Sequence, residues 1–134
     1  MRGIDILEHN NDGYKPVLDF NSWRVALMND IEKNHPDKIA YLERHNETDE
    51  AFILLDGRCT LIFCTSPDQP DALSFCEMEK GKVYNVKMGT WHTNLLYEGS
   101  KVLIVENLNT SKENSSYFYD LSEAQKEFIL KSSI

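Results

Sequence analysis

Short runs of alternating hydrophobic and polar residues recur along most of this chain. In Trp23–Met28, for example, Trp23, Val25 and Leu27 alternate with their neighbours, and this period of two predicts a half-buried strand. Seven further runs follow, separated by turns rich in Gly, Pro, Asp and Ser: Ile39–His45, Ala51–Leu55, Cys59–Thr65, Leu73–Glu79, Lys82–Lys87, His92–Tyr97 and Lys101–Asn107. No segment of helical period separates them, so the pattern indicates an antiparallel sandwich or barrel.

The two ends of the chain have different patterns. Residues 1–20 are predicted to be an irregular arm, and 29–38 a loop with one helical turn. Near the C-terminus, Asp120 and Glu123 resemble a capping box, and apolar residues fall on one helical face. These are Leu121, Ala124, Phe128 and Ile129. We therefore expect an arm over 1–20, a barrel over 21–110, and an extension over 111–134 whose helix packs on the barrel.

Composition narrows the classes of partner. The 134 residues include 14 Lys and Arg against 22 Asp and Glu, a net charge of −8. This excess of acid argues against nucleic acid or a membrane surface as partner. No apolar run approaches the roughly 20 residues of a membrane helix, and no secretory signal is recognisable. Cys59, Cys64 and Cys76 lie inside predicted strands, as buried reduced thiols do. We expect a single-domain cytoplasmic protein.

Two segments carry side chains that bind metals. Glu43 and His45 are two residues apart, so on a strand they face the same way, and Glu50 can return from the next strand. After a turn at Gly89, His92 enters a further strand. These four side chains are predicted to converge.

The two segments resemble the paired motifs of the cupin superfamily. The first motif is present as Glu43-x-His45-x4-Glu50-x6-Gly57, and the second as Gly81-x5-Lys87-x-Gly89-x2-His92-x3-Leu96. The chain departs from the family pattern where Glu43 replaces a His, Lys87 a Pro and Leu96 an Asn. The glycine that precedes the first motif is also missing. The resemblance implies an all-β, single-domain, cupin-type double-stranded β-helix (jelly-roll) barrel, with the N-terminal arm and the short C-terminal helix added to it.

By position, the resemblance assigns Glu43, His45, Glu50 and His92 as ligands of one divalent metal ion. Two His and two Glu suit Mn, Fe, Ni or Zn without selecting among them. Burying two carboxylates without a cation costs several kcal/mol unless one is protonated. The alternative is that Glu43 points away, or that the site has lost its metal. His9 and His35 are expected in solvent-exposed loops.

Strand parity places further residues at the same site. Tyr41 shares the face of Glu43, Phe52 that of Glu50, and Asn94 that of His92. These three are the candidate ligand-pocket residues, although filling of the core also explains Phe52. A pocket that is mostly apolar, with a few convergent polar groups, is typical of small-molecule sites.

The resemblance favours a metal-dependent enzyme acting on a small hydroxylated metabolite, by isomerase, epimerase or lyase-type chemistry on a sugar. In that reading Glu43, released from the ion, is a candidate general base. The alternative is a non-catalytic cupin that binds a small molecule, with or without metal; a purely structural protein would leave the convergent ligands unexplained. Cupins of one barrel commonly pair and open sheet edges need cover, so we expect a homodimer.

Overall fold

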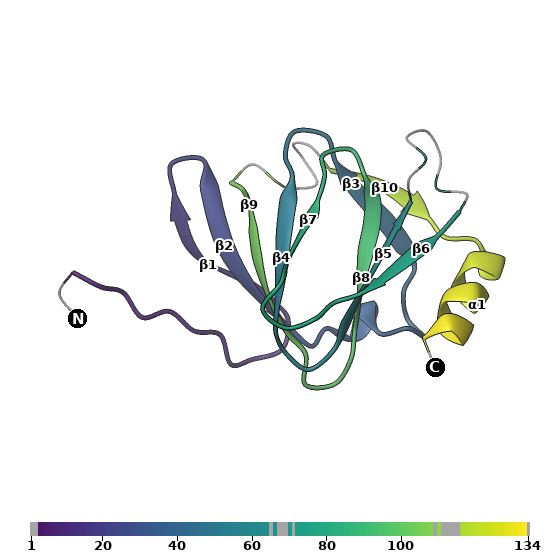
Figure 1. The fold of residues 1–134 in the computed structure, drawn as a ribbon, viewed down its shortest axis with the longest axis horizontal. Coiled ribbons are helices and arrows are strands. Elements are labelled where there is room, and N and C mark those ends of the chain that lie inside the picture. Colours follow the sequence, from purple (N-terminus) through teal and green to yellow (C-terminus); the bar gives the residue numbers. More distant parts are fainter. Residues whose placement is uncertain are drawn as a thin grey trace.

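A computed structural model describes residues 3–64, 66, 70, 72–108, 110 and 116–133. It contains two antiparallel five-stranded sheets that face each other (Figure 1). The first sheet has the order β1-β2-β9-β4-β7 and the second β10-β3-β8-β5-β6. The strands are β1 (Tyr14–Phe20), β2 (Trp23–Asn29), β3 (Tyr41–His45), β4 (Glu50–Asp56), β5 (Cys59–Cys64), β6 (Ser74–Glu77), β7 (Val83–Val86), β8 (Trp91–Leu96), β9 (Lys101–Asn107) and β10 (Ser116–Asp120). This architecture is the jelly-roll barrel expected from the sequence.

All eight strands predicted from alternation are present, with ends that agree with the prediction to within two residues. The expected helical turn is the 3₁₀ helix η1 (Glu32–Asn34). Two strands were missed. The prediction that residues 1–20 are irregular was wrong for β1, which pairs with β2. Its register shifts between Pro16 and Leu18, and proline is tolerated in a strand at such an irregularity on a sheet edge.

The second missed strand, β10, pairs along its whole length with β3. The turn between β10 and the helix also differs from the prediction. The helix α1 (Glu123–Ser132) begins after Ser122, whose side chain accepts a hydrogen bond from the Gln125 N–H, while the Gln125 side chain accepts one from the Ser122 N–H. The capping box is therefore Ser122 with Gln125, and Asp120 ends a strand instead.

Apolar side chains form two layers. Between the sheets, one cluster includes Phe52, Leu54 and Ile104. On the outer face of the second sheet, another cluster gathers Leu42, Ile62 and Leu95 beneath Ile129 of α1. Strand β8 of this sheet is therefore covered on both faces, and every one of its residues is buried. The inner layer leaves space between the sheets for the site.

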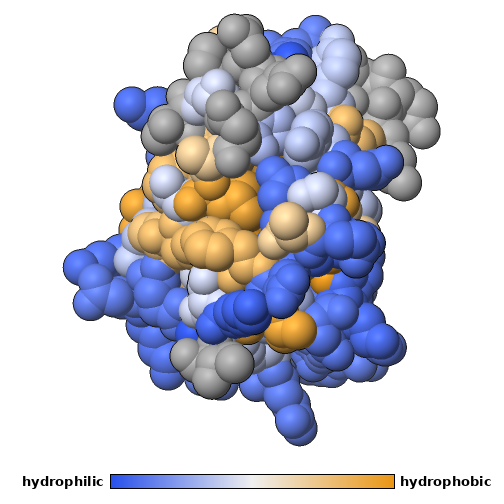
Figure 2. Space-filling model, turned by 90° about the vertical axis from the view of Figure 1, so that its right-hand side faces the viewer, coloured by the Kyte–Doolittle hydropathy of each residue, from blue (hydrophilic) through white to orange (hydrophobic). Residues whose placement is uncertain are grey.

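The face that carries α1 is partly apolar. Figure 2 shows hydrophobic residues gathered in a band across this face, with hydrophilic residues around it. Phe128 and Leu130 of α1 are exposed, and the Phe128 ring lies 5.7 Å from that of Phe75. Thus Phe128, expected on the packed side of the helix, is only partly covered.

The three cysteines are free thiols in the described part of the chain. Cys59 and Cys64 are buried, as expected, whereas Cys76 is half-buried. Burial raises the pKa of the Cys59 thiol to about 12. None of the described helices is long and apolar enough to cross a membrane.

Candidate metal centre

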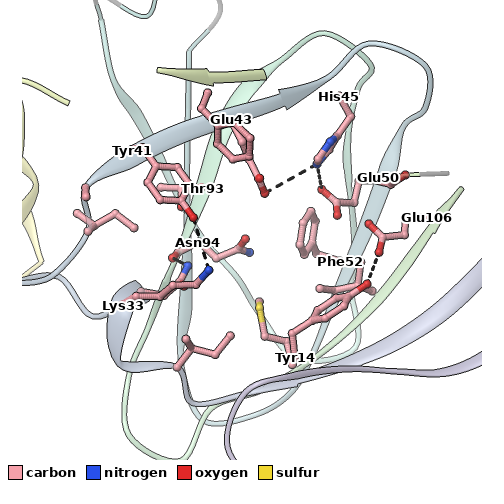
Figure 3. Close-up of a pocket in the computed structure, with 18 of the residues that line it drawn as sticks. Tyr14, Lys33, Tyr41, Glu43, His45, Glu50, Phe52, Thr93, Asn94 and Glu106 are labelled. Carbon is pink, nitrogen blue, oxygen red and sulfur yellow. Dashed lines mark hydrogen bonds and ion pairs between the residues drawn. The ribbon is translucent and has the colours of Figure 1, made fainter. Parts of the chain in front are cut away.

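The wall of the site is built by β3 of the second sheet. Tyr41, Glu43 and His45 are alternate residues of this strand, and all three line a cavity of about 370 Å³ between the sheets (Figure 3). Glu43 points into the cavity, with 36% of its side chain exposed, whereas only 6% of the His45 side chain is exposed. The sequence prediction that these three share one face is confirmed.

His92 reaches the site from β8, the neighbouring strand. It is the direct register partner of Glu43, so strand pairing alone places the two residues side by side. The His92 ring is fully buried, with its Nδ1 2.9 Å from the Thr90 carbonyl oxygen. That hydrogen bond fixes the ring and directs Nε2 into the barrel interior, as the outer nitrogen of a metal-binding histidine is commonly fixed.

Glu50 comes from β4 of the opposite sheet. Its Oε1 lies 3.0 Å from His92 Nε2 and 3.4 Å from His45 Nε2. Burial raises the pKa of this carboxyl, but hydrogen bonds from His45 and His92 outweigh it and hold the pKa well below the usual range. For His92, burial lowers the pKa and the Glu50 carboxylate more than reverses this, so its pKa is raised. Glu50 is therefore a charged group between two imidazoles.

The four predicted side chains are thus brought together. One ligand atom each from Glu43, His45 and His92 lie within 4.8 Å of one another, and Glu50, which is outside this group, contacts the two histidines. The Glu43 Oε1 is 3.8 Å from His45 Nε2, on the side away from Glu50 in Figure 3. Imidazole nitrogens and carboxylate oxygens are ligand types that divalent transition metals take in proteins.

The predicted pocket residues also line the cavity. In Figure 3, Tyr41 lies to the left and Phe52 to the right, with Asn94 between them. Phe52 is almost fully buried, so it fills the core as well as bordering the cavity. The volume falls within the range of about 300–1,000 Å³ found for small-molecule sites.

The sequence analysis missed an acidic residue behind the site. Glu106 of β9 is buried, and its carboxyl group accepts hydrogen bonds from the Tyr14 hydroxyl and from Arg24 Nε at 2.9 Å. Burial raises its pKa to about 7, and the hydrogen-bonded Glu50 carboxylate adds to the effect. A signal was available, because Glu106 shares a strand face with the apolar Val102 and Ile104.

Tyr14, Arg24 and Lys33 also line the cavity and were not foreseen. Tyr14 lies on β1, which the sequence pattern did not reveal. Arg24 belongs to a predicted strand, but on the face expected to be polar. Lys33 lies on η1, whose position against the barrel is a long-range property of the fold.

The two remaining histidines lie outside the cavity, but not as expected. His9 is buried, and its Nε2 donates to the Gly13 carbonyl oxygen at 2.8 Å. Its own carbonyl oxygen accepts hydrogen bonds from Asn29 and Lys101. The expectation of an exposed His9 was therefore wrong, because the arm folds back onto β2 there. His35 is half-buried and contacts Asp30.

Comparison with known proteins supports the architecture. No protein-family model and no curated protein matches this sequence. A cupin-2 domain protein from Shewanella frigidimarina matches with a TM-score of 0.50 and 21% identity, over 74% of this chain and 84% of the other. KdgF from a Halomonas species matches with a TM-score of 0.53 and 10% identity, over 84% and 94%.

A third match is CapF from Staphylococcus aureus, a capsular polysaccharide assembling protein, with a TM-score of 0.56 and 17% identity. It covers 87% of this chain but 32% of CapF, so this chain spans about a third of that protein. Fold and site together define a class of protein, a two-sheet β-barrel with a cluster of His and Glu side chains inside it. The fold is that of the cupins, as the motif resemblance implied.

Proposed function

We propose that this protein binds one divalent metal ion through Glu43, His45, Glu50 and His92. The convergence of these side chains, of which Glu43, His45 and Glu50 line the cavity and His92 is buried beside them, is the observation that carries the proposal. The ion's identity, among Mn, Fe, Ni and Zn, is open because imidazole and carboxylate ligands suit them all.

We further propose that the protein acts on a small hydroxylated metabolite by isomerase, epimerase or lyase-type chemistry. A bound metal ion would polarise a hydroxyl or carbonyl group of the substrate. Tyr41 and Asn94 would orient the substrate, and Phe52 would keep water from one side of it. Glu43 has the most exposed carboxylate of the candidate ligands and faces the cavity, so it is the group best placed to accept a proton from a substrate carbon.

Metal content tests the first proposal. Elemental mass spectrometry of the purified protein should find about one equivalent of a transition metal, retained in His35→Ala and lost in His92→Ala. His35→Ala is the matched control, because it removes a histidine outside the cavity. If the native protein contains no metal as purified and takes up none of Mn, Fe, Ni or Zn when they are added, the metal proposal fails. The barrel is then a metal-free ligand-binding protein.

Glu43→Gln separates the two roles of Glu43. If Glu43 is a general base and not a ligand, the variant should keep its metal content. Its turnover of any sugar or hydroxy acid that the native protein converts should then fall at least about 100-fold. A ligand role predicts instead weaker metal binding in the same variant. If no compound in a panel of sugars and hydroxy acids is turned over with any of the four metals, the enzymatic proposal fails.

A further inference from the structure

The wall of the cavity away from Glu50 carries a positive charge. Lys33 lines the cavity, and its Nζ lies 3.5 Å from the Tyr41 hydroxyl (Figure 3). In the described part of the chain, no carboxylate oxygen lies within the 4.0 Å ion-pair distance of this Nζ. Lys80, Lys82, Lys126 and Lys131 do have such partners, whereas Lys38, which also lines the cavity, has none among the described residues.

The elements that carry Lys33 and Tyr41 are anchored by neighbouring residues, although Lys33 itself is exposed. The Asn34 amide donates to the Asn94 carbonyl oxygen at 2.9 Å, which anchors η1 to β8 beside Lys33. The Tyr41 ring packs edge-on against Phe118, with ring centroids 5.3 Å apart. The ammonium and the hydroxyl are therefore presented together from two anchored elements.

The charges around the cavity favour an anion at this position. Arg24 also lines the cavity, but Glu106 and the Thr110 carbonyl oxygen already occupy its guanidinium group. A divalent ion would offset the charges of Glu43 and Glu50. The charges of Lys33 and of Lys38, which also lines the cavity, would then have no counterpart there, so a negatively charged ligand group would complement them.

We propose that Lys33 and Tyr41 form a subsite for the carboxylate of the substrate, which is a hydroxy acid rather than a neutral sugar. The inference rests on the proposed function, since it assumes that the other end of the ligand meets the metal centre. Tyr41 and Glu43 are two residues apart on β3, a distance of about 7 Å, which a chain of about six carbon atoms can span. The net charge of −8 for the whole chain does not reveal this local positive charge at Lys33.

The test compares D-gluconate with D-glucitol, which share a six-carbon polyol chain and differ in the terminal carboxylate. Calorimetric titration of the native protein should show at least about tenfold tighter binding of gluconate, since a charged hydrogen bond is lost with glucitol. Lys33→Met should abolish this preference, and Tyr41→Phe should reduce it about threefold. Lys82→Met, which removes a lysine charge at an exposed turn, should leave it unchanged.

Several results would overturn the subsite. They are equal binding of the two compounds, no binding of either at about 10 mM, or a preference that survives Lys33→Met because the carboxylate binds the ion. Metal titration of the native protein and of Lys33→Met accompanies each experiment. Metal binding without a carboxylate preference contradicts the subsite alone. A preference that depends on Lys33 in a protein that takes up no metal contradicts the metal centre alone.

Discussion

At the scale of single residues, the candidate site depends on a pair of buried carboxyl groups. Burial and the neighbouring Glu50 carboxylate raise the pKa of Glu106 to about 7, so below this pH the Glu106 carboxyl group carries a proton that it can share with Glu50. The Tyr14 hydroxyl and Arg24 hold the other side of the Glu106 carboxyl. Glu106 therefore fixes the position of Glu50 from behind, while the two histidines hold Glu50 in front.

This arrangement predicts different effects of two substitutions at Glu106. In Glu106→Gln the amide can donate to Glu50 while the amide oxygen accepts from Arg24 and Tyr14, so the free energy of unfolding should change by less than about 1 kcal/mol. Glu106→Ala leaves the buried partners unsatisfied and should cost roughly 3 kcal/mol. Urea denaturation of the metal-free protein at about pH 6, below the pKa of Glu106, measures both. Equal losses in the two variants would contradict the shared proton.

The residues of the site differ in how far the sequence reveals them. Glu43, His45, Glu50 and His92 could be found because the spacing of two short motifs survives, although Glu43 stands where the family pattern has a His. Strand parity then added Tyr41, Phe52 and Asn94, which line the cavity. Parity could also have found Glu106. Lys33 and Tyr14 could not be found, since their elements are placed by contacts with residues distant in the sequence.

At the scale of elements, alternation revealed the strands that are buried on at least one face. It failed for β1, whose residues are nearly all exposed, and for β10, which follows a polar segment. In both strands the extended conformation is set by pairing with a neighbouring strand. The alternation of apolar and polar residues does not reveal such pairing. The helix was found, but its start was displaced, because Asp120 and Ser122 both precede a suitable partner three residues later.

An ion pair between Arg58, which directly precedes β5, and Glu77 of β6 gives a pH-dependent contribution to stability. Arg58 and Thr60 hydrogen-bond to Glu77, and although burial opposes it, these bonds lower the pKa of Glu77. A lowered pKa stabilises the fold above the unfolded pKa of about 4.5, and this contribution disappears as pH falls through the folded value. Because the pair is half exposed, Glu77→Gln should cost less than about 1 kcal/mol at neutral pH.

The same variant should match the native protein in stability once the pH lies below the folded pKa of Glu77. Thermal unfolding of both proteins between about pH 3 and pH 7 measures the difference. Glu79→Gln is the matched control, because Glu79 pairs with Lys82 inside a single turn. A difference between Glu77→Gln and the native protein that is independent of pH would contradict this account.

At the scale of the whole molecule, the surface leaves apolar groups uncovered. The arm extends away from the barrel, with Ile4, Ile6 and Leu7 exposed, and β1 forms an open sheet edge (Figure 1). Phe20 and Trp23 are exposed beside that edge. Exposed apolar groups next to an unpaired edge favour association with a second copy.

We therefore predict a homodimer, which light scattering at micromolar concentration should detect as twice the monomer mass. Substitution of Ile4, Ile6 and Leu7 by serine should yield monomers, because it removes the apolar side chains of the arm without altering the barrel. Serine at Phe128 and Leu130 is the control for the other apolar face. A native protein that is monomeric refutes the prediction.

The candidate ligands come from both sheets: Glu50 from the first, and Glu43, His45 and His92 from the second. An ion held by all four would act as a cross-link through the middle of the barrel, joining segments that share no backbone hydrogen bonds. Removing it would leave each sheet intact but weaken the attachment of one to the other. Metal binding at this centre would thus determine how rigidly the two sheets are held around a ligand in the cavity between them.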